Sequence, residues 1–322
     1  MKASPSCRAI VVGSHGQDGR FLTDALKASG CLVAALSRSA LDLYGAQSAA
    51  PIDILDRDSV YRLMCDFRPC ELYYLAAHHG SSEASAALDP PELMRKSYET
   101  HVLGYENFLL AAKEHCPSTR IFYAASSHVF GWPTVRPQNE QTPFDPQCVY
   151  GITKATGVFL GRYYRREFGI HASAGILYNH ESVYRRPGFV SRRIAETVAN
   201  IARGSEDVLT VGNLDAVVDW GYAPDYVDAM RAIVALESAD DYVVATGEAH
   251  TIGEFVAQAF EEAGVVDWRN RVVVDPHLIT AKPRNLLGDA AKLKAATGWT
   301  PRVSFSEMVG ILVRHYLTSD RR

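Results

Sequence analysis

The chain has 322 residues, of which 47% are hydrophobic and 22% are charged, and its formal net charge is −4. This length provides for one large domain or two modest domains with a buried core, and it excludes a small scaffold that depends on disulfides. The charge balance gives no support for binding to nucleic acid or to an anionic membrane surface. No apolar run reaches the length of a membrane span, and the first residues lack the apolar segment of a signal peptide.

Six cysteines are scattered along the chain without a Cys-x-x-Cys pair. We therefore expect all of them to be reduced thiols in a cytoplasmic protein. They are Cys7, Cys31, Cys65, Cys70, Cys116 and Cys148.

A glycine-rich turn follows the first predicted strand, residues 8–12, and opens an amphipathic helix that reaches about residue 29. Gly13, Gly16 and Gly19 allow a tight turn, close approach of a pyrophosphate, and close packing of the helix on the strand. The helix N-terminus offers free amides and the positive end of its dipole to phosphates. This order predicts a dinucleotide-binding turn, and the alternative is a turn with a purely structural role.

The end of the second predicted strand, residues 31–36, bears on the choice of dinucleotide. Arg38 follows it where a carboxylate would be expected to bind the ribose 2′-hydroxyl of NAD. Because an arginine can bind a 2′-phosphate, the sequence favours NADP. NAD stays possible, since Arg38 could also be a solvated residue at a strand end.

Strands and helices alternate through the first half of the chain, which predicts a parallel sheet with helices on both faces. A third strand at 51–55 carries Asp53, which we expect to meet the adenine amino group. The other expected elements are a helix at 58–67, a strand at 71–77, a long helix at 91–115 and a strand at 120–125.

Three histidines in this half could suggest metal binding. His78 and His79 are adjacent, so their side chains point apart in an extended segment, and no further ligand set is evident. We therefore expect no metal site. His101 lies within the long predicted helix, where we expect it to have a capping or packing role.

The fifth strand ends at Ser126, Ser127 and His128, and ligands of open parallel sheets lie at the carboxyl ends of strands. A proline-rich segment can then return the chain to Tyr150 at the same edge. Tyr150 and Lys154 share a helix face at positions i and i+4, so we expect the ammonium to lower the pKa of the phenol. The phenol would then be a usable general base. The alternative is a chance Tyr-x-x-x-Lys spacing on a solvated helix.

The second half supplies a sixth strand at 175–178, whose end places Asn179 toward a substrate, and a seventh strand at 242–246. We predict an α/β fold: a doubly wound parallel (Rossmann) sheet with a smaller C-terminal α/β substrate lobe. The dinucleotide-binding domain would span 1–174, with 219–247 returning to it, and the substrate lobe 175–218 and 248–322. The lobe would contain helices at 188–203, 252–263 and 304–316 and a strand at 208–211.

Several motifs together resemble a known family. The chain resembles extended short-chain dehydrogenases/reductases and is most similar to GDP-mannose 4,6-dehydratases, over nearly its whole length. The segments that carry the resemblance are Gly16-Gln17-Asp18-Gly19, Asn179-His180-Glu181-Ser182, 211–215, 219–221, 245–247, 287–289 and 298–301, with the set Ser126, Tyr150 and Lys154.

The resemblance implies a reaction without net redox change. Tyr150 would take a proton from the sugar 4-hydroxyl while hydride leaves C4 for NADP. Lys154 would hold the nicotinamide ribose, and Ser126 would hydrogen-bond the reacting oxygen. The 4-ketone then acidifies the C5 proton, water is eliminated from C5 and C6, and the hydride returns to C6.

The resemblance also implies binding residues and an assembly. A homodimer or dimer of dimers would form through the helices at 91–115 and 150–165, although core packing would explain their apolar stripes too. The implied cofactor-binding residues are Gly13, His15, Gly16, Gln17, Asp18, Gly19, Arg38, Asp53, Ile54, Leu75, Ala76, Ala77, Tyr150, Lys154, Leu177, Asn179 and His180. The implied substrate-binding residues are His79, Ser127, Asn179, Arg185, Arg193, Asn213 and Arg284.

Two catalytic positions depart from the family pattern. Ser126 replaces a threonine, and His128 replaces the acid/base glutamate two residues further on. A histidine titrates near neutrality and could perform the same proton transfer. The replacement could equally mean that elimination is lost and that only oxidation or reduction at C4 remains.

The grip on the substrate diphosphate also departs from the pattern. Val218 replaces a family arginine, and Lys282-Pro283-Arg284 replaces a second Arg-Pro. Loss of a bidentate anion clamp weakens the case for an unmodified GDP-sugar. Residues that could compensate are Arg185, Arg186, Arg192, Arg193, which stands at the position of a family substrate-binding lysine, and Arg284.

Three functional hypotheses follow from the sequence. The first is an NADP-dependent nucleotide-sugar dehydratase acting on a sugar nucleotide, which the resemblance implies to be GDP-linked. The second is a 4-keto-sugar reductase, C4 oxidase or epimerase of the same superfamily. The third is a catalytically idle protein that senses a dinucleotide.

Overall fold

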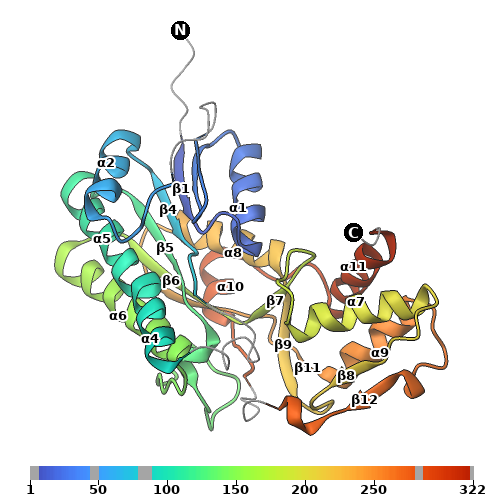
Figure 1. Ribbon diagram of the computed structural model, residues 1–322. Helices are drawn as coiled ribbons and strands as arrows, with labels where there is room; N and C mark the ends of the chain where they lie inside the picture. The colour runs from blue at the N-terminus through green and yellow to red at the C-terminus, as the bar shows by residue number, and fades with distance from the viewer. Residues whose placement is uncertain (1–6, 44–50, 79–88, 280–285, 320–322) are drawn as a thin grey trace.

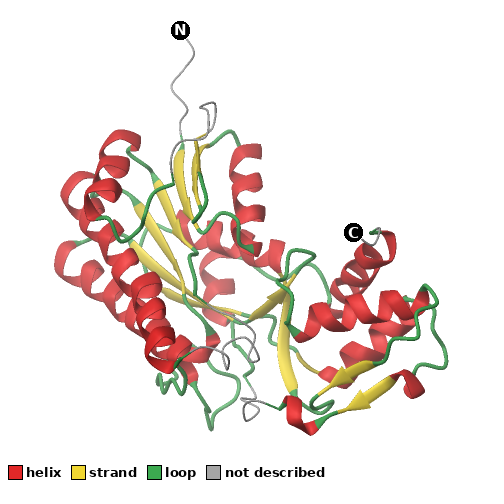
Figure 2. Ribbon diagram, in the orientation of Figure 1, coloured by secondary structure: helices red, strands yellow, loops and turns green. Residues whose placement is uncertain are grey.

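The computed structural model describes residues 7–43, 51–78, 89–279 and 286–319 (Figure 1). A larger body of sheet and helices contains most of the N-terminal half, and a smaller lobe built mainly from later elements lies beside it (Figure 2). None of the helices in the described ranges is long and apolar enough to span a membrane.

The larger body is built on a seven-stranded sheet in the order β10-β6-β5-β4-β1-β2-β3, and every pairing but that of β3 is parallel. The strands are nearly continuous apolar runs, as expected when both faces of a sheet are covered. The predicted Rossmann sheet is therefore confirmed. The strands are β10 (Asp241–Val244), β6 (Ala172–Leu177), β5 (Arg120–Ala124), β4 (Glu71–Tyr74), β1 (Arg8–Val12), β2 (Leu32–Leu36) and β3 (Leu41–Leu43).

The third predicted strand, at 51–55, is wrong. These residues form no strand, and the sheet is instead extended by β3, which runs antiparallel to β2. The Asp53 carboxylate accepts a hydrogen bond from the Leu55 N–H at 2.9 Å, and its carbonyl accepts one from the Asp56 N–H. A short polar side chain that binds nearby backbone favours such a turn over a strand.

Helices cover both faces of the sheet (Figure 1). On one face α2, α5 and α6 bury side chains such as Val60, Phe108 and Val158. On the other, α1, α8 and α10 bury Leu22, Ile233 and Leu293. The sequence prediction did not name α8 or α10. The helices are α1 (Gln17–Ala28), α2 (Arg57–Phe67), α5 (Gly104–His115), α6 (Val149–Phe168), α8 (Ala223–Ala235) and α10 (Ala291–Thr297).

The long helix predicted at 91–115 contains a wider turn. It consists of α4 (Pro90–Tyr98), a π-helical turn at Glu99–Leu103, and α5. Two carbonyls of that turn accept tyrosine hydroxyls, from Tyr74 at 2.6 Å and from Tyr123 at 3.0 Å. His101 in this turn is fully buried, accepts the His78 N–H at 2.9 Å and bonds Thr153 at 2.7 Å, so its predicted packing role is confirmed.

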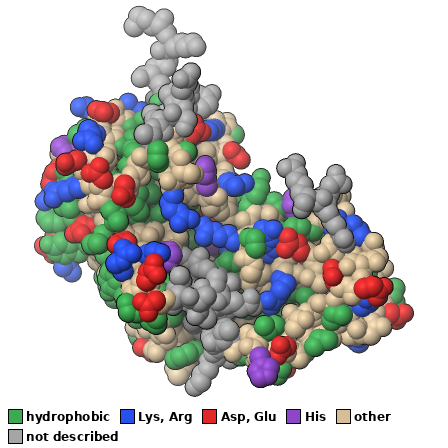
Figure 3. Space-filling model, in the orientation of Figure 1, with side chains coloured by type: hydrophobic (Ala, Val, Ile, Leu, Met, Phe, Trp, Pro, Cys, Tyr) green, Lys and Arg blue, Asp and Glu red, His purple; other side chains and the backbone are tan. Residues whose placement is uncertain are grey.

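The smaller lobe has its own apolar core, which includes Ile194, Trp220, Phe255 and Leu312. Lysine and arginine side chains gather on one face where this lobe meets the larger body (Figure 3). The predicted division at 174, 218 and 247 stays a prediction. Its elements are α7 (Val190–Ala202), α9 (Ile252–Glu262), α11 (Phe305–Thr318), the sheet β11 (Ala249–Thr251), β9 (Val217–Tyr222) and β7 (Asn179–Glu181), and the pair β8 (Leu209–Val211) and β12 (Val272–Val274).

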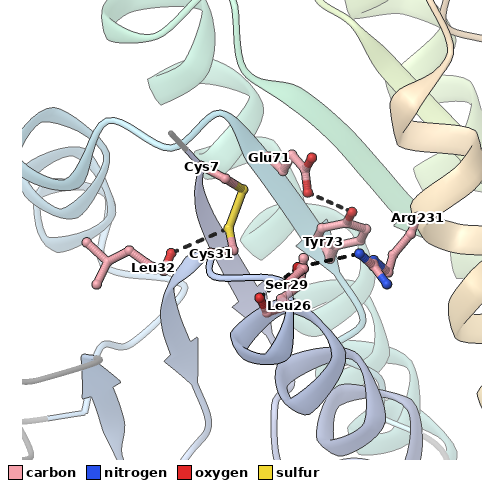
Figure 4. Close-up of a disulfide and its surroundings, with 8 residues drawn as sticks. All are labelled: Cys7, Leu26, Ser29, Cys31, Leu32, Glu71, Tyr73 and Arg231. Carbon is pink, nitrogen blue, oxygen red and sulfur yellow. Dashed lines mark hydrogen bonds between the residues drawn. A yellow bond between two sulfur atoms is a disulfide. The ribbon is translucent and has the colours of Figure 1, made fainter. Parts of the chain in front are cut away.

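A disulfide joins Cys7 to Cys31, so the prediction that all six cysteines are reduced is wrong (Figure 4). The parallel register pairs Arg8 with Leu32, which places the two preceding residues side by side with their Cα atoms 4.8 Å apart. That separation lies within the range a disulfide can bridge. Sequence spacing could not reveal a contact that depends on strand register. The free cysteines are Cys65, Cys70, Cys116 and Cys148.

Candidate functional site

The glycine turn between β1 and α1 has a backbone that side chains would obstruct. Gly13 has φ +95°, and a Cβ there would lie 2.8 Å from the Ala76 nitrogen. A Cβ on Gly19 would lie 2.3 Å from the Gly13 carbonyl oxygen, so these two positions require glycine. Leu75 also lies against this turn, because its N–H donates to the Val12 carbonyl at 2.8 Å.

The same turn leaves polar groups available for a ligand. Gly16 is the N-cap of α1 and provides no side-chain bond to the first helical amides. The Ser14 hydroxyl is buried and has no hydrogen-bond partner among the described residues. Unsatisfied amides and a buried hydroxyl at a helix N-terminus fit a diphosphate, so this turn can hold the phosphates of a dinucleotide.

Gln17 and Asp18, both predicted to bind cofactor, contact β7. The Asp18 carboxylate oxygens each lie 3.0 Å from His180 Nε2. Gln17 donates to the His180 carbonyl at 3.0 Å and accepts the Ser182 hydroxyl at 2.9 Å. The structure therefore brings Gln17, Asp18 and His180 together, with their side chains engaged with protein.

The other predicted cofactor residues differ in how far they are exposed. Ile54 is half-buried, and its carbonyl accepts an Asn107 N–H at 2.9 Å, whereas Asp53 is exposed. His15 and Arg38 are exposed too. Leu177 is buried at the end of β6, and Asn179 is exposed at the start of β7.

Positive charge collects around His78 at the end of the segment after β4. Burial lowers the pKa of His78, and Lys96, Arg38 and Arg186 lower it further because like charges disfavour the imidazolium. These three cations therefore act on one place although they come from three separate segments. Such a cluster suits an anionic ligand.

Tyr150 lies at the carboxyl ends of β5 and β6, near the start of α6. Its phenol hydrogen-bonds the Ser126 hydroxyl. The His128 ring stands edge-on to the Tyr150 ring, with centroids 5.5 Å apart, and the His101 ring does so at 5.3 Å. Ser126, His128 and Tyr150 are thus brought into one cluster, as their sequence positions predict.

Lys154 lies beside this cluster but does not act on the phenol as predicted. Its Nζ is 5.7 Å from the Tyr150 ring centroid and donates to the Ala124 carbonyl at 2.7 Å. Burial raises the pKa of Tyr150 to about 12, although the bond with Ser126 opposes this rise. Burial also lowers the pKa of Lys154 to about 7. The expected lowering of the phenol pKa is therefore wrong for this structure, because removal from water disfavours both charged forms.

His128, the predicted acid/base residue, contacts two neighbours of Tyr150. Its Nδ1 lies 3.8 Å from the Cys148 thiol, and its N–H donates to the Ser126 hydroxyl at 3.3 Å. The ring is partly exposed. A titratable ring that is accessible and adjacent to Tyr150 can exchange protons with a ligand in the same place.

The predicted substrate residues differ in their contacts and in their exposure. Arg185 is ion-paired with Glu181 at 2.8 Å and lies over the Phe189 ring. Arg193 is half-buried on α7, and Asn213 accepts the N–H of Asp215 at 2.9 Å. Ser127 is buried beside the catalytic cluster. His79 and Arg284 lie outside the described residues.

Two buried polar residues organise the edge of this site and were missed by sequence reasoning. Gln138 accepts the Tyr178 hydroxyl at 2.9 Å and the Leu287 N–H at 3.0 Å. The Asp219 carboxylate accepts hydrogen bonds from Thr246, Gly247 and Gly288. Asp219 stood in a motif that could have signalled it, whereas Gln138 lies in a proline-rich segment without a pattern.

A cavity of about 540 Å³ lies at the opposite edge of the sheet, at the amino ends of β1, β4 and β5. Its lining includes Arg8, Cys70, Glu71 and Arg120. Ligands of open parallel sheets bind at the carboxyl ends of strands, so this cavity is separate from the candidate site.

No group of three or more histidines, cysteines or acidic residues in the described part of the chain could hold a metal ion. His79 falls outside that part, so the expected lack of a metal site stays a prediction. The arrangement described above uses a hydroxyl, a phenol, an amine and an imidazole. These groups perform proton transfer, and the glycine turn beside them fits a dinucleotide.

Solved structures share this fold over nearly the entire chain. The structure of RMD from Pseudomonas aeruginosa complexed with NADPH aligns with a TM-score of 0.82 and 23% identity, covering 98% of this chain and 100% of that one. dTDP-glucose 4,6-dehydratase from Bacillus anthracis in complex with NAD aligns with a TM-score of 0.80 and 17% identity, covering 97% and 96%. At these identities the likeness concerns the fold.

Sequence comparison is more specific. The family model for GDP-mannose 4,6 dehydratase matches residues 10–312. The chain is 34% identical to GDP-mannose 4,6 dehydratase 2 of Arabidopsis thaliana, with 98% of this chain and 88% of that protein aligned. It is 32% identical to the GDP-mannose 4,6 dehydratase of Drosophila melanogaster, with 95% and 85% aligned. The chain therefore belongs to the GDP-mannose 4,6-dehydratase family, among the extended short-chain dehydrogenase/reductase enzymes.

Proposed function

We propose that this protein is an NADP-dependent nucleotide-sugar 4,6-dehydratase that acts on a GDP-linked sugar. The observation that carries this proposal is the cluster of Ser126, His128 and Tyr150, with Lys154 beside it, at the same sheet edge as the glycine turn. Relatives named for this activity and a structural neighbour that holds NADPH support it.

Tyr150 removes the proton of the sugar 4-hydroxyl in this proposal, and Ser126 holds the reacting oxygen. When bound, an oxidised nicotinamide supplies a hydride acceptor and a positive charge. Because an opposite charge favours a phenolate, we expect Tyr150 to ionise only when cofactor is bound. Its pKa of about 12 describes the phenol among the groups of the protein alone.

Lys154 binds the nicotinamide ribose in this proposal. An ammonium has three N–H donors, and one of them is used by the Ala124 carbonyl. Two donors are left for ribose hydroxyls. Burial lowers the pKa of Lys154 to about 7, so the ammonium and the neutral amine are both present near neutral pH. Ribose oxygens that accept hydrogen bonds would favour the ammonium.

His128 carries out the proton transfers at C5 and C6 in place of the family glutamate. The neutral ring takes the C5 proton, which the 4-ketone has made acidic, and the imidazolium returns a proton to the departing C6 hydroxyl. Its partial exposure and its contact with Tyr150 support this assignment.

The phosphates of the two ligands are assigned to cationic residues. Arg38 binds the 2′-phosphate of NADP in this proposal, because it is exposed beyond β2 and acts electrostatically on the same imidazole as Arg186. Arg193 and Arg284 bind the sugar-nucleotide diphosphate in this proposal, and Arg185, which is ion-paired with Glu181, is a further candidate.

A second candidate is a 4-keto-sugar reductase or epimerase on the same site. The observation that favours it is that His128 stands where the resemblance places a glutamate, since a neutral imidazole has neither the charge nor the shape of the carboxylate that would perform the proton transfers at C5 and C6. Both candidates use Tyr150, Lys154 and Ser126 for hydride transfer at C4.

Incubation with GDP-mannose and catalytic NADP distinguishes the candidates. A 4-keto-6-deoxy product, detected by mass spectrometry without net change in NADPH absorbance, supports the dehydratase. With stoichiometric cofactor, formation of NADPH from NADP or consumption of NADPH by a 4-keto-sugar supports the oxidoreductase, and an isomeric sugar nucleotide without net change in NADPH supports the epimerase. No turnover of GDP-, UDP- or dTDP-sugars by protein that binds NADPH would contradict both.

The assembly and the location of the protein stay proposals as well. Exposed aromatic residues on α6, Phe159 and Tyr163, support a homodimer through this helix. Light scattering on the wild type and on Phe159→Glu tests it, since the charge should produce monomers. The disulfide removes the argument from reduced thiols, so a cytoplasmic location needs a fractionation experiment.

A further inference from the structure

Two residues of β7 and its continuation, His180 and Ser182, bind the first turn of α1 across more than 160 positions of sequence. His180 contacts both Asp18 oxygens at 3.0 Å, and Gln17 is held between the His180 carbonyl at 3.0 Å and the Ser182 hydroxyl at 2.9 Å. These bonds join the phosphate-binding turn of the larger body to the second sheet.

The partners of the His180 ring determine its protonation state. Nδ1 lies 2.7 Å from the Tyr178 carbonyl oxygen, which can only accept a hydrogen bond. Nε2 lies 3.0 Å from both oxygens of Asp18, and an ionised carboxylate can only accept as well. A neutral imidazole has one N–H, so both contacts are satisfied only by the imidazolium.

The surroundings of the ring agree with a cation. Tyr226 of α8 stacks on it with centroids 4.4 Å apart, and an aromatic face attracts positive charge. Burial alone would lower the pKa of His180, but the Asp18 charge and hydrogen bond raise it above 6.5, against opposition from Arg185. Burial likewise tends to raise the pKa of Asp18, and His180 lowers it below 3.8.

We propose that His180 is a positioning residue, whose imidazolium fixes Asp18 and thereby holds the phosphate-binding turn against β7. The proposal rests on the proposed function in one respect, namely that this turn holds a dinucleotide. The ring bonds Asp18 and the Tyr178 carbonyl, and the His180 carbonyl bonds Gln17. The effect of His180 on the reaction therefore passes through Asp18 and Gln17.

The strand β7 also contacts a residue that is predicted to bind substrate, Arg185. Glu181 follows His180, pairs with Arg185 at 2.8 Å and accepts the Ser191 hydroxyl of α7 at 2.7 Å. A shift of β7 would therefore move Arg185 together with the phosphate turn. Loss of one His180 ring proton removes the imidazole donor either to Asp18, which still accepts a longer bond from Gln17 at 3.3 Å, or to the Tyr178 carbonyl, and a lost hydrogen bond at a buried acceptor is unfavourable.

The first test is a histidine titration that needs no ligand. We expect the His180 ring proton, followed by NMR in wild-type protein and assigned by its absence from His180→Gln, to titrate above pH 6.5. Asp18→Asn should lower that midpoint, because the amide no longer stabilises the imidazolium. A wild-type midpoint at or below 6.5, or an unchanged midpoint in Asp18→Asn, would overturn the proposal.

The second test measures NADPH affinity by fluorescence between pH 5.5 and 9.5. We expect His180→Gln to bind about tenfold more weakly than wild type at low pH, the effect of losing one charge-assisted bond, and the difference to vanish as pH rises through the His180 midpoint. Lys154 titrates in both proteins, so the difference between the curves isolates His180. His115→Gln, an exposed histidine on α5, is the control and should match wild type.

The two tests separate the possible failures. A thermal melt of each variant identifies a protein that has not folded, and Asp18→Asn then serves as the second variant. If wild type binds no NADPH although His180 titrates high, the proposed function fails. If wild type binds NADPH but the His180→Gln difference is absent or independent of pH, the positioning role is overturned.

Discussion

Two pairs of groups in this site, Asp18 with His180 and Tyr150 with Lys154, are each partly or wholly buried, and their pKa values respond in opposite ways. In the first pair the pKa shifts favour both charged forms, and in the second they favour both neutral forms. Asp18 lies 3.0 Å from the His180 ring, whereas the Lys154 ammonium donates to the neutral Ala124 carbonyl and has the neutral rings of Tyr123 and Tyr150 near it. A partner of opposite charge in direct contact outweighs desolvation, and a neighbour on the same helix face does not.

The largest expected effect concerns the second pair. Tyr150→Phe removes the proposed base, so we expect the rate of product formation to fall by about 10³-fold, within the range general bases contribute. NADPH affinity, measured by fluorescence, should change little, because the ring that packs against His101 and His128 is kept. Near-normal turnover by this variant would show that another group removes the proton.

The first pair should matter for stability. Asp18→Ala leaves the His180 cation without its partner, and because Asp18 is partly exposed we expect a loss of about 2 kcal/mol in the free energy of unfolding. The pair is intact between the lowered pKa of Asp18 and the raised pKa of His180, so the loss should be greatest between pH 3.8 and 6.5. It should shrink as pH rises through the His180 pKa.

Urea unfolding at pH 6 and pH 9 measures this difference. Asp58→Ala is a matched control, because Asp58 is an exposed acid in the first turn of α2. Equal losses in Asp18→Ala and Asp58→Ala at pH 6 would show that the buried pair contributes no more than an ordinary helix-end charge.

Ser126 links the phenol to its surroundings, because its hydrogen bond lowers the pKa of Tyr150. Ser126→Ala should raise that pKa further, so we expect a rate about tenfold lower at neutral pH and an optimum shifted to higher pH. Ser126→Thr keeps a hydroxyl and should restore both properties. A pH profile of kcat/KM that is identical in Ser126→Ala and wild type would contradict the link.

The smallest expected effect is a gain in stability. The pKa of Lys154 falls from 10.5 to about 7 on burial, so the folded state disfavours the ammonium. Lys154→Met should therefore raise the free energy of unfolding at pH 7 by about 1 kcal/mol while it lowers turnover. The free energy of unfolding of the wild type should rise between pH 7 and 10.5, where the unfolded chain still binds the Lys154 proton and the folded chain does not. The advantage of Lys154→Met over the wild type should therefore disappear across this range.

Urea unfolding at pH 7 and pH 10 tests this prediction. Lys294→Met, at an exposed position of α10, is the control and should leave stability unchanged at both values. A destabilised Lys154→Met at pH 7 would mean that the bond to the Ala124 carbonyl outweighs the desolvation of the ammonium.

Local patterns in the sequence predicted most of the larger body. The glycine spacing at 13, 16 and 19, the apolar strands and the meeting of Ser126 with Tyr150 all depend on short segments or on the general geometry of parallel sheets. For the same reason the helices of the smaller lobe were predicted within a few residues, and α9 and α11 begin with capping boxes that mark their N-termini.

Most of the features that the sequence did not predict depend on distant contacts. The pairing of Cys7 with Cys31 follows from strand register, and the bond between Asp18 and His180 joins residues 162 positions apart. The pKa of Tyr150 depends on burial by several elements, which an i and i+4 spacing does not describe. The segment at 51–55 was predicted as a strand from its apolar residues, but Asp53 instead closes a turn.

The disulfide encloses β1, the glycine turn and α1 within one covalent ring, since Cys7 precedes the first strand and Cys31 precedes the second. Such a ring restricts the unfolded chain and, for 24 residues between its ends, stabilises the fold by about 3 kcal/mol in the chain-entropy description. A reductant would therefore lower the free energy of unfolding of the fold that contains the glycine turn. The thiol–disulfide balance around the protein thus bears on how stable that turn and its helix are.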